Sequence, residues 1–141
     1  MPSEFIVVIG TLISAIIAGA ISYVAGRGMK THEWRLSLAK EEIASRKNLY
    51  VAFLAEAHRL LFKSTEKKIS SASELKDLDA KYVEISILSS PFVVEAAKFV
   101  VDSILIAHTK GDEKPDTDFY ARKEQFIDAV RRELISYEKS N

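Results

Sequence analysis

Apolar and uncharged residues fill the chain from Phe5 to Ala25, and no Asp, Glu, Lys or Arg interrupts them. As a helix rising about 1.5 Å per residue, this stretch spans roughly 32 Å, close to the hydrocarbon thickness of a bilayer. The segment MPSEF before it holds Glu4 and no basic residue, unlike the start of a cleaved signal peptide. The pattern therefore predicts a retained transmembrane helix over residues 1–26.

Small residues recur at every fourth position within this apolar stretch. One row consists of Gly10, Ser14, Ala18, Ser22 and Gly26, and a neighbouring row consists of Thr11, Ala15 and Gly19. Lipid tails are as apolar as leucine, so membrane helices associate through close backbone approach, which small residues permit. We therefore expect a homo-oligomer packed along these rows. The hydroxyls of Thr11, Ser14 and Ser22 leave open a second interpretation, in which the same rows line a narrow pore.

Basic residues follow the apolar stretch, and none precedes it. Arg27, Lys30 and Arg35 lie close after its end, where they would meet the lipids of the inner leaflet. The positive-inside rule then places the N-terminus outside and residues 27–141 in the cytoplasm, with the span in the inner membrane. Tyr23 falls near the inner interface, where a phenol reaches the headgroups.

The remaining residues show helical spacing of apolar positions and no strand pattern. Residues 33–63 place Trp34, Leu38, Leu49, Tyr50, Phe53, Leu54, Ala57, Leu60 and Leu61 largely on one side. Further helices are predicted over 72–89, 91–108 and 117–137. Gly26 and Gly28 either kink the junction with the span or lie within one continuous helix. The predicted fold class is all-α: one N-terminal transmembrane helix plus a cytoplasmic bundle of about four helices.

Local signals mark where these helices begin and end. Ser71 with Glu74 fits a capping box, and Ser90 followed by Pro91 fits an N-cap with proline at the first helical position. Gly111 is expected to end the third helix. That helix carries charges only at Glu95, Lys98 and Asp102, which form one narrow stripe. Because the rest of its circumference is apolar, we expect it to be central or to meet a neighbouring subunit.

The net charge of the chain is zero, but the two signs are unevenly distributed. Residues 27–68 hold ten Lys and Arg against five acids, and residues 69–141 hold ten against fourteen. In the basic part, a candidate anion or nucleotide site comprises Arg46, Lys47, Arg59 and Lys63. The alternative is the solvated face of an amphipathic helix, because Glu41, Glu42, Glu56 and Glu66 are interleaved with these cations.

Residues for catalysis or metal binding are sparse. The chain has no cysteine, and His32, His58 and His108 share no metal-ligand spacing. Arg27 and His32 match a loose R-x4-H nuclease motif, but they lie at the predicted membrane edge. We therefore expect no enzyme, no catalytic residue, no cofactor and no metal ion.

Three segments carry a resemblance that covers the chain in layout: RKNLYVAFLAEAHRLL, SSPFVVEAAKFVV and FIDAVRRELI. They resemble the recurring helices of small single-pass bacterial membrane proteins that act as effectors of anti-phage defence. The examples are the membrane accessory protein of type VI-B CRISPR loci and the channel of Hailong-type defence. The resemblance implies a homo-oligomeric pore, gated in the second case by a DNA oligomer, and it carries over no functional residue.

Two functions from different classes follow. The first is a homo-oligomeric inner-membrane protein that forms a gated pore or channel, whose cytoplasmic helices sense a signal in anti-phage defence. A nucleotide or oligonucleotide is a candidate ligand. The second is a membrane-tethered scaffold or adaptor that docks a cytoplasmic protein partner without conducting ions. The small-residue rows and the apolar third helix favour self-assembly, as the first function requires.

Overall fold

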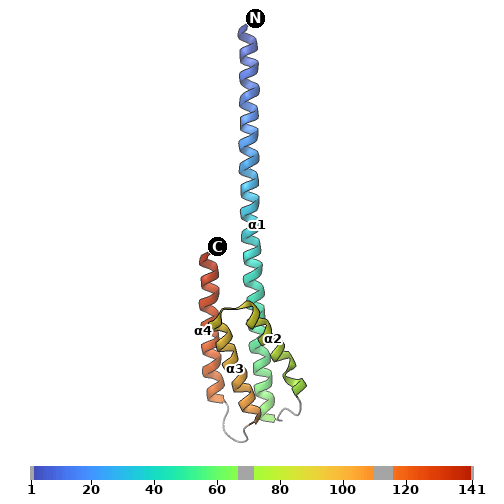
Figure 1. Ribbon diagram of the computed structural model, residues 1–141, viewed down its shortest axis with the longest axis vertical. Coiled ribbons are helices and arrows are strands. Elements are labelled where there is room, and N and C mark those ends of the chain that lie inside the picture. The colour runs from blue at the N-terminus through green and yellow to red at the C-terminus, as the bar shows by residue number, and fades with distance from the viewer. Residues whose placement is uncertain (1, 67–71, 110–115, 141) are drawn as a thin grey trace. The chain divides into compact units, whose positions relative to one another are not determined.

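Every element that the structure describes is helical (Figure 1). The computed structural model describes the backbone of residues 2–66, 72–109 and 116–140, and the side chains of residues 15, 17–66, 72–109 and 118–140. The elements are helix α1 (Pro2–Glu66), a short 3₁₀ helix (Ala72–Leu75), α2 (Lys76–Leu88), α3 (Pro91–Thr109) and α4 (Asp116–Ser140). The predicted all-α fold class is therefore confirmed.

The chain divides into two compact units, residues 1–41 and residues 42–141. The first unit consists of the N-terminal part of α1, and every described side chain from Ala15 to Leu38 is exposed. Helix α1 runs through Gly26 and Gly28 without a break, so of the two alternatives at these glycines the continuous helix holds.

Within the part of the chain whose residues are described, none of the helices has both the length and the apolar character of a membrane span. The side chains of residues 5–14 and 16, about half of the predicted span Phe5–Ala25, lie outside that part. The transmembrane helix and the boundary at residue 26 therefore stay predictions.

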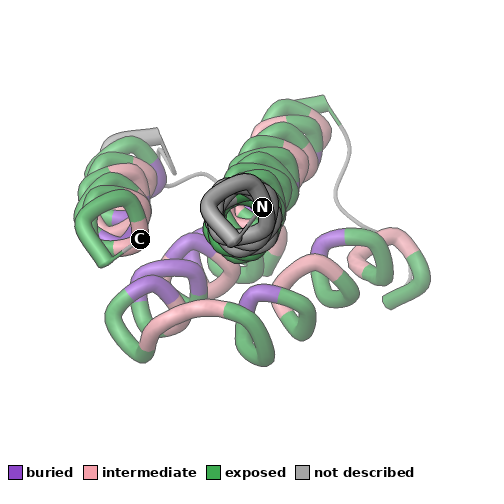
Figure 2. The backbone as a smooth tube through the Cα atoms, turned by 90° about the horizontal axis from the view of Figure 1, so that it is seen from above, coloured by how far each residue is buried: buried purple, intermediate pink, exposed green. Residues whose placement is uncertain are grey.

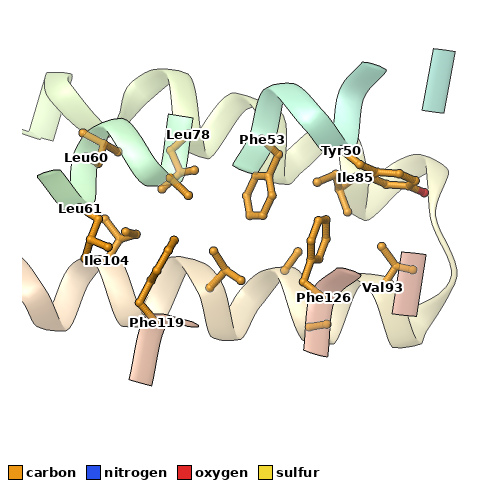
Figure 3. Packing of buried hydrophobic residues seen from close by; sticks show 14 of the residues in the cluster. Tyr50, Phe53, Leu60, Leu61, Leu78, Ile85, Val93, Ile104, Phe119 and Phe126 are labelled. Atoms are coloured by element: carbon orange, nitrogen blue, oxygen red, sulfur yellow. The ribbon is translucent and has the colours of Figure 1, made fainter. Parts of the chain in front are cut away.

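The hydrophobic core belongs entirely to the second unit (Figure 3). Helix α1 buries one stripe spaced three and four residues apart, as the 3.6-residue period requires. This stripe consists of Leu49, Tyr50, Phe53, Ala57, Leu60 and Leu61. Helix α4 contributes Phe119 and Phe126, and the ring of Phe126 lies 5.2 Å from the ring of Phe53. Leu78 and Ile85 of α2, together with the buried face of α3, complete the packing, so α1 is one wall of the bundle.

Two residues of the predicted first stripe do not join this core. Trp34 is 64% exposed and Leu38 is 44% exposed, and both lie in the first unit. They continue the helical spacing of Leu49 and Phe53, but α2, α3 and α4 all belong to the second unit. Periodicity identifies the face of a helix, and it does not say how far along the helix a partner extends.

The predicted start of α3 is confirmed. Pro91 is its first residue, and the Ser90 carbonyl accepts the first helical hydrogen bond from the Val94 N–H at 3.1 Å. The predicted helix over 72–89 is instead a 3₁₀ turn followed by α2 from Lys76. The Ser71 half of the capping box and the stop at Gly111 both lie outside the described residues.

Helix α3 is buried on one face rather than on most sides (Figure 2). Its buried residues are Val93, Ala96, Ala97, Val100, Ser103, Ile104 and Ala107. Of its charge stripe, Glu95 and Lys98 are exposed and Asp102 is half-buried. Phe92, Leu105 and Ile106 also stay exposed. A single chain therefore leaves large apolar side chains of α3 uncovered.

Candidate functional site

The guanidinium of Arg46, one of the predicted anion-binding groups, is engaged inside the bundle. Arg46 is almost fully buried. Its Nε and Nη2 donate to Glu42 Oε1 at 3.3 and 2.9 Å. Nη1 donates to the carbonyl oxygen of Leu88, at the end of α2. The guanidinium carbon lies 4.5 Å from the ring centre of Tyr137 on α4. Arg46 therefore holds α1 to α2 and α4.

Two of the other predicted cations also have carboxylate partners. The Arg59 guanidinium pairs with Glu56 one turn earlier at 2.6 Å, and the Lys63 ammonium pairs with Glu74 at 2.9 Å. Lys47 is exposed. Arg46 and Arg59 are separated along α1 by about 20 Å, since each residue adds about 1.5 Å. The structure thus divides the predicted set into two distant pairs, and the anion site stays a prediction.

A buried polar cluster that was not among the predicted sites surrounds Glu133 of α4. One carboxylate oxygen accepts a hydrogen bond from the Tyr50 hydroxyl, and the other accepts one from the Ser90 N–H at 2.5 Å. The Tyr50 hydroxyl also lies 2.7 Å from Ser89 Oγ. Glu133 is only 6% exposed, so in the folded chain two protein donors replace the water molecules that would otherwise hydrogen-bond this carboxylate.

The start of helix α3 stabilises the negative charge of the Glu133 carboxylate. Helix α3 begins next to it, and the first turn of a helix presents free N–H groups and a partial positive charge. Burial, followed in importance by the hydrogen bond to Glu133, raises the pKa of Tyr50 to about 12. The phenol therefore stays protonated at neutral pH, and it acts as a donor to the carboxylate.

The Glu133 cluster joins α1, the α2–α3 connection and α4, so its role is to fix their arrangement. A signal for it existed in the sequence. Phe126, Val130, Glu133 and Tyr137 are spaced by four, three and four residues, which places the glutamate on the apolar face of α4. A single acid on such a face predicts a hydrogen-bond donor beside it, because burying a carboxylate without a partner costs free energy of folding.

The predicted packing rows fall in the first unit. Ala15, Ala18, Gly19, Ser22 and Gly26 are exposed there, and a Cβ atom added at Gly19 or Gly26 would meet nothing within 4 Å. Of Gly10, Thr11 and Ser14 the structure describes only the helical backbone. Arg27, Lys30 and Arg35, the residues predicted to lie at the membrane interface, are exposed as well.

No cluster of three or more His, Cys, Asp or Glu side chains suited to a metal ion occurs among the described residues. Arg27 and His32, the loose nuclease match, are both exposed on α1. His58 Nδ1 lies 3.1 Å from the Leu54 carbonyl, and His108 Nε2 lies 2.9 Å from the Leu60 carbonyl. These two imidazoles therefore have backbone partners within the bundle.

Comparison with known proteins adds no relative: no protein-family model, no curated protein and no solved structure matches the chain. The resemblance to small bacterial membrane effectors therefore stays a prediction, and the class that the structure itself defines is an all-α helical bundle with a long first helix.

Proposed function

We propose that this chain is a membrane-tethered, self-associating helical scaffold whose bundle, residues 42–141, docks protein surfaces. One observation carries the proposal: three of the four predicted anion-binding cations have partners within the chain, whereas several large apolar side chains outside the core are exposed. Arg46, Arg59 and Lys63 are paired within the chain, whereas Phe92 is 79% exposed. Such a surface favours association with protein over binding of an anionic ligand.

The tether rests on the sequence. The uncharged stretch Phe5–Ala25 is long enough to cross a bilayer, and the basic residues Arg27, Lys30 and Arg35 follow it. The small-residue rows within that stretch would let spans of several copies approach closely. A scaffold tethered in the inner membrane, with its bundle in the cytoplasm, is consistent with the uncharged stretch, the basic residues after it and the small-residue rows.

Ion conduction is the second candidate, because one sequence feature favours it. Thr11, Ser14 and Ser22 would bring hydroxyls to the packed rows, and a ring of spans with hydroxyls on one side forms a polar lining. This candidate needs a trigger, and three of the four cations predicted to bind an anionic one already have partners within the chain. A channel effector of anti-phage defence is therefore the alternative.

The experiment combines topology, assembly and flux on the full chain. Because the sequence lacks cysteine, single cysteines at Ser3 and Ser140 report which side of the membrane each end occupies. We expect a thiol reagent that cannot cross the membrane to label Ser3→Cys from outside and Ser140→Cys only after lysis. The detergent-extracted protein should be oligomeric, and replacing both Ser14 and Ala18 by Leu should make it monomeric.

Flux assays in liposomes separate the two candidates. An oligomer that passes no ions supports the scaffold, and one that conducts supports the channel. Recovery of the wild-type chain as a soluble monomer would overturn both. The same double substitution leaving the oligomer intact would show that the small rows are not its contact.

A further inference from the structure

Helix α1 carries an aromatic and basic stripe within the first unit. The stripe consists of Tyr23, Arg27, Lys30 and Trp34, which are spaced by four, three and four residues. At 3.6 residues per turn, this spacing keeps all four within roughly 60° of the helix circumference. They share one face because α1 runs from Pro2 to Glu66 without a break (Figure 1).

The side chains of this Tyr23–Trp34 stripe are uncovered. Tyr23 is 68% exposed and Trp34 is 64% exposed, and both cations between them are exposed too. Among the ion pairs of the described residues, none includes Arg27 or Lys30, in contrast to Arg59 of the bundle. These two cations can therefore contact anions outside the chain.

The charge of the stripe has one sign. Glu33 is the one acid between residues 23 and 38, and it precedes Trp34 by a single residue. It therefore lies about 100° around the helix from Trp34, and Arg35 lies about as far to the other side. The stripe itself presents two positive charges and no negative one, which is complementary to an anionic surface.

The order of side chains along the stripe matches the boundary of a bilayer. Tyr23 falls in the last turn of the uncharged stretch, and Arg27 and Lys30 follow that stretch directly. Tyrosine and tryptophan collect at the headgroup level of membranes, and basic side chains next to a span attract anionic phospholipids.

Trp34 lies farther along the helix, nine residues or about 14 Å beyond Ala25. Helical side chains point back toward the N-terminus, which brings the indole closer to the predicted span. Transmembrane helices are tilted by about 20° on average, and a tilt toward the stripe brings the indole closer still to the headgroups.

The stripe and the small-residue rows occupy different faces of α1. Ser22 and Gly26 of one row precede Tyr23 and Arg27 by one residue each, so the two faces are about 100° apart. One face can therefore pack against another copy while the other face meets lipid.

We propose that the Tyr23–Trp34 stripe is a binding surface for the headgroups of anionic phospholipids. Arg27 and Lys30 contact the phosphates, and Tyr23 and Trp34 flank them on the same face. This inference rests on the membrane tether of the proposed function. It adds the class of lipid that is bound, and it gives a role to a tryptophan that the hydrophobic core does not cover.

Trp34 is the only tryptophan of the chain, so its fluorescence reports on this stripe alone. The full chain is reconstituted in vesicles of phosphatidylglycerol and phosphatidylcholine, with bromine near the top of the acyl chains of one lipid at a time. Bromine quenches an indole that it contacts. We expect brominated phosphatidylglycerol to quench Trp34 more strongly at equal mole fraction, with a preference of about fivefold for each contacting cation.

Charge removal tests the two cations. Lys30→Gln should lower the preference for phosphatidylglycerol about fivefold, and the double variant Arg27→Gln with Lys30→Gln should abolish it. Lys40→Gln is the matched control, because Lys40 is an exposed cation of α1 that lies about 120° around the helix from Trp34. It should leave the preference unchanged, and the same preference in the wild type and the double variant would overturn the proposal.

A further variant tests whether the two faces are separate. Replacing both Ser14 and Ala18 by Leu should leave the preference for phosphatidylglycerol intact even where it makes the protein monomeric. Loss of the preference in this variant would overturn the assignment of lipid and self-association to different faces.

Thiol labelling of Ser3→Cys and Ser140→Cys in the same vesicles distinguishes this inference from the proposed function. If one of the two cysteines is protected, which shows insertion, but both lipids quench Trp34 equally, the lipid proposal fails and the tether stands. If the indole is shielded from acrylamide and neither lipid quenches it, a protein surface covers the stripe and the lipid proposal fails. If the chain is not inserted, the tether fails with it.

Discussion

Glu133→Ala tests the buried polar cluster, because the carboxylate of Glu133 accepts from the buried Tyr50 hydroxyl and from the half-buried Ser90 N–H. Its removal leaves the Ser90 N–H without its acceptor and removes the acceptor of the Tyr50 hydroxyl. Each buried donor deprived of its partner costs about 1–3 kcal/mol. Because Ser89 Oγ stays 2.7 Å from the Tyr50 hydroxyl and Ser90 is half-buried, we expect the free energy of unfolding of the bundle to fall by about 1–3 kcal/mol.

The assay is urea unfolding of the full chain in detergent, followed by far-UV circular dichroism. Fluorescence of Trp34 is unsuitable, because that residue is exposed and lies outside the unit that unfolds. Glu138→Ala is the matched control, since Glu138 is an exposed acid on the same helix. Glu133→Gln should give an intermediate loss, because its amide retains one acceptor and places a donor against the other partner.

A double variant makes the reasoning sharper. Glu133→Leu alone removes the carboxylate acceptor of the buried Tyr50 hydroxyl and leaves it only Ser89 Oγ, and adding Tyr50→Phe removes that hydroxyl. The double variant should therefore lose less stability than the sum of the two single variants. If Glu133→Ala unfolds at the same urea concentration as Glu138→Ala, or if the two losses simply add, the cluster does not hold the bundle together.

Three further outcomes follow from the structure. The pKa of Tyr50, about 12 when folded, exceeds the usual value of 10, so its contribution to stability is complete below pH 10 and is lost as the pH rises toward 12; urea midpoints across that range should fall less steeply in Tyr50→Phe. Arg46→Glu should lower the thermal midpoint and Lys47→Glu should leave it unchanged, since the Arg46 guanidinium is bonded within the bundle and the Lys47 side chain is exposed; equal midpoints would refute a structural role for Arg46, and weaker oligonucleotide binding by folded Lys47→Glu would support the predicted anion site. Ile104→Asp should prevent stable folding, by a cost of several kcal/mol, whereas Ile106→Asp, at a position 46% exposed, should be tolerated; comparable expression and melting of the two variants would contradict the observed face of α3.

The helices of the bundle could be predicted from the sequence because their signals are local. The spacing of Leu49, Phe53 and Leu60 and the Ser90–Pro91 start depend on neighbours within a turn or two, and each appears in the structure as expected. The extent of the core could not be read in the same way. Trp34 keeps the spacing but lies in a different unit from the packing helices.

The candidate sites were harder to predict because they depend on contacts between distant residues. Arg46 is one cation among several in the sequence, and only the fold brings it to the Leu88 carbonyl and the Tyr137 ring. The exposure of Phe92 follows from which face of α3 the other helices cover. No spacing along a single helix contains that information.

The Glu133 cluster also affects how the protein folds while it is being made. The residues of its central contact, Tyr50 and Glu133, are 83 positions apart in the chain. At about 5–20 residues per second, roughly 4–17 seconds of synthesis separate them. During that interval the apolar stripe of α1 lacks its α4 partners, and only α2 and α3 become available to cover it. Newly made chains at high concentration are therefore most exposed to mispairing before α4 arrives, and a chaperone that binds apolar helices would act in this interval.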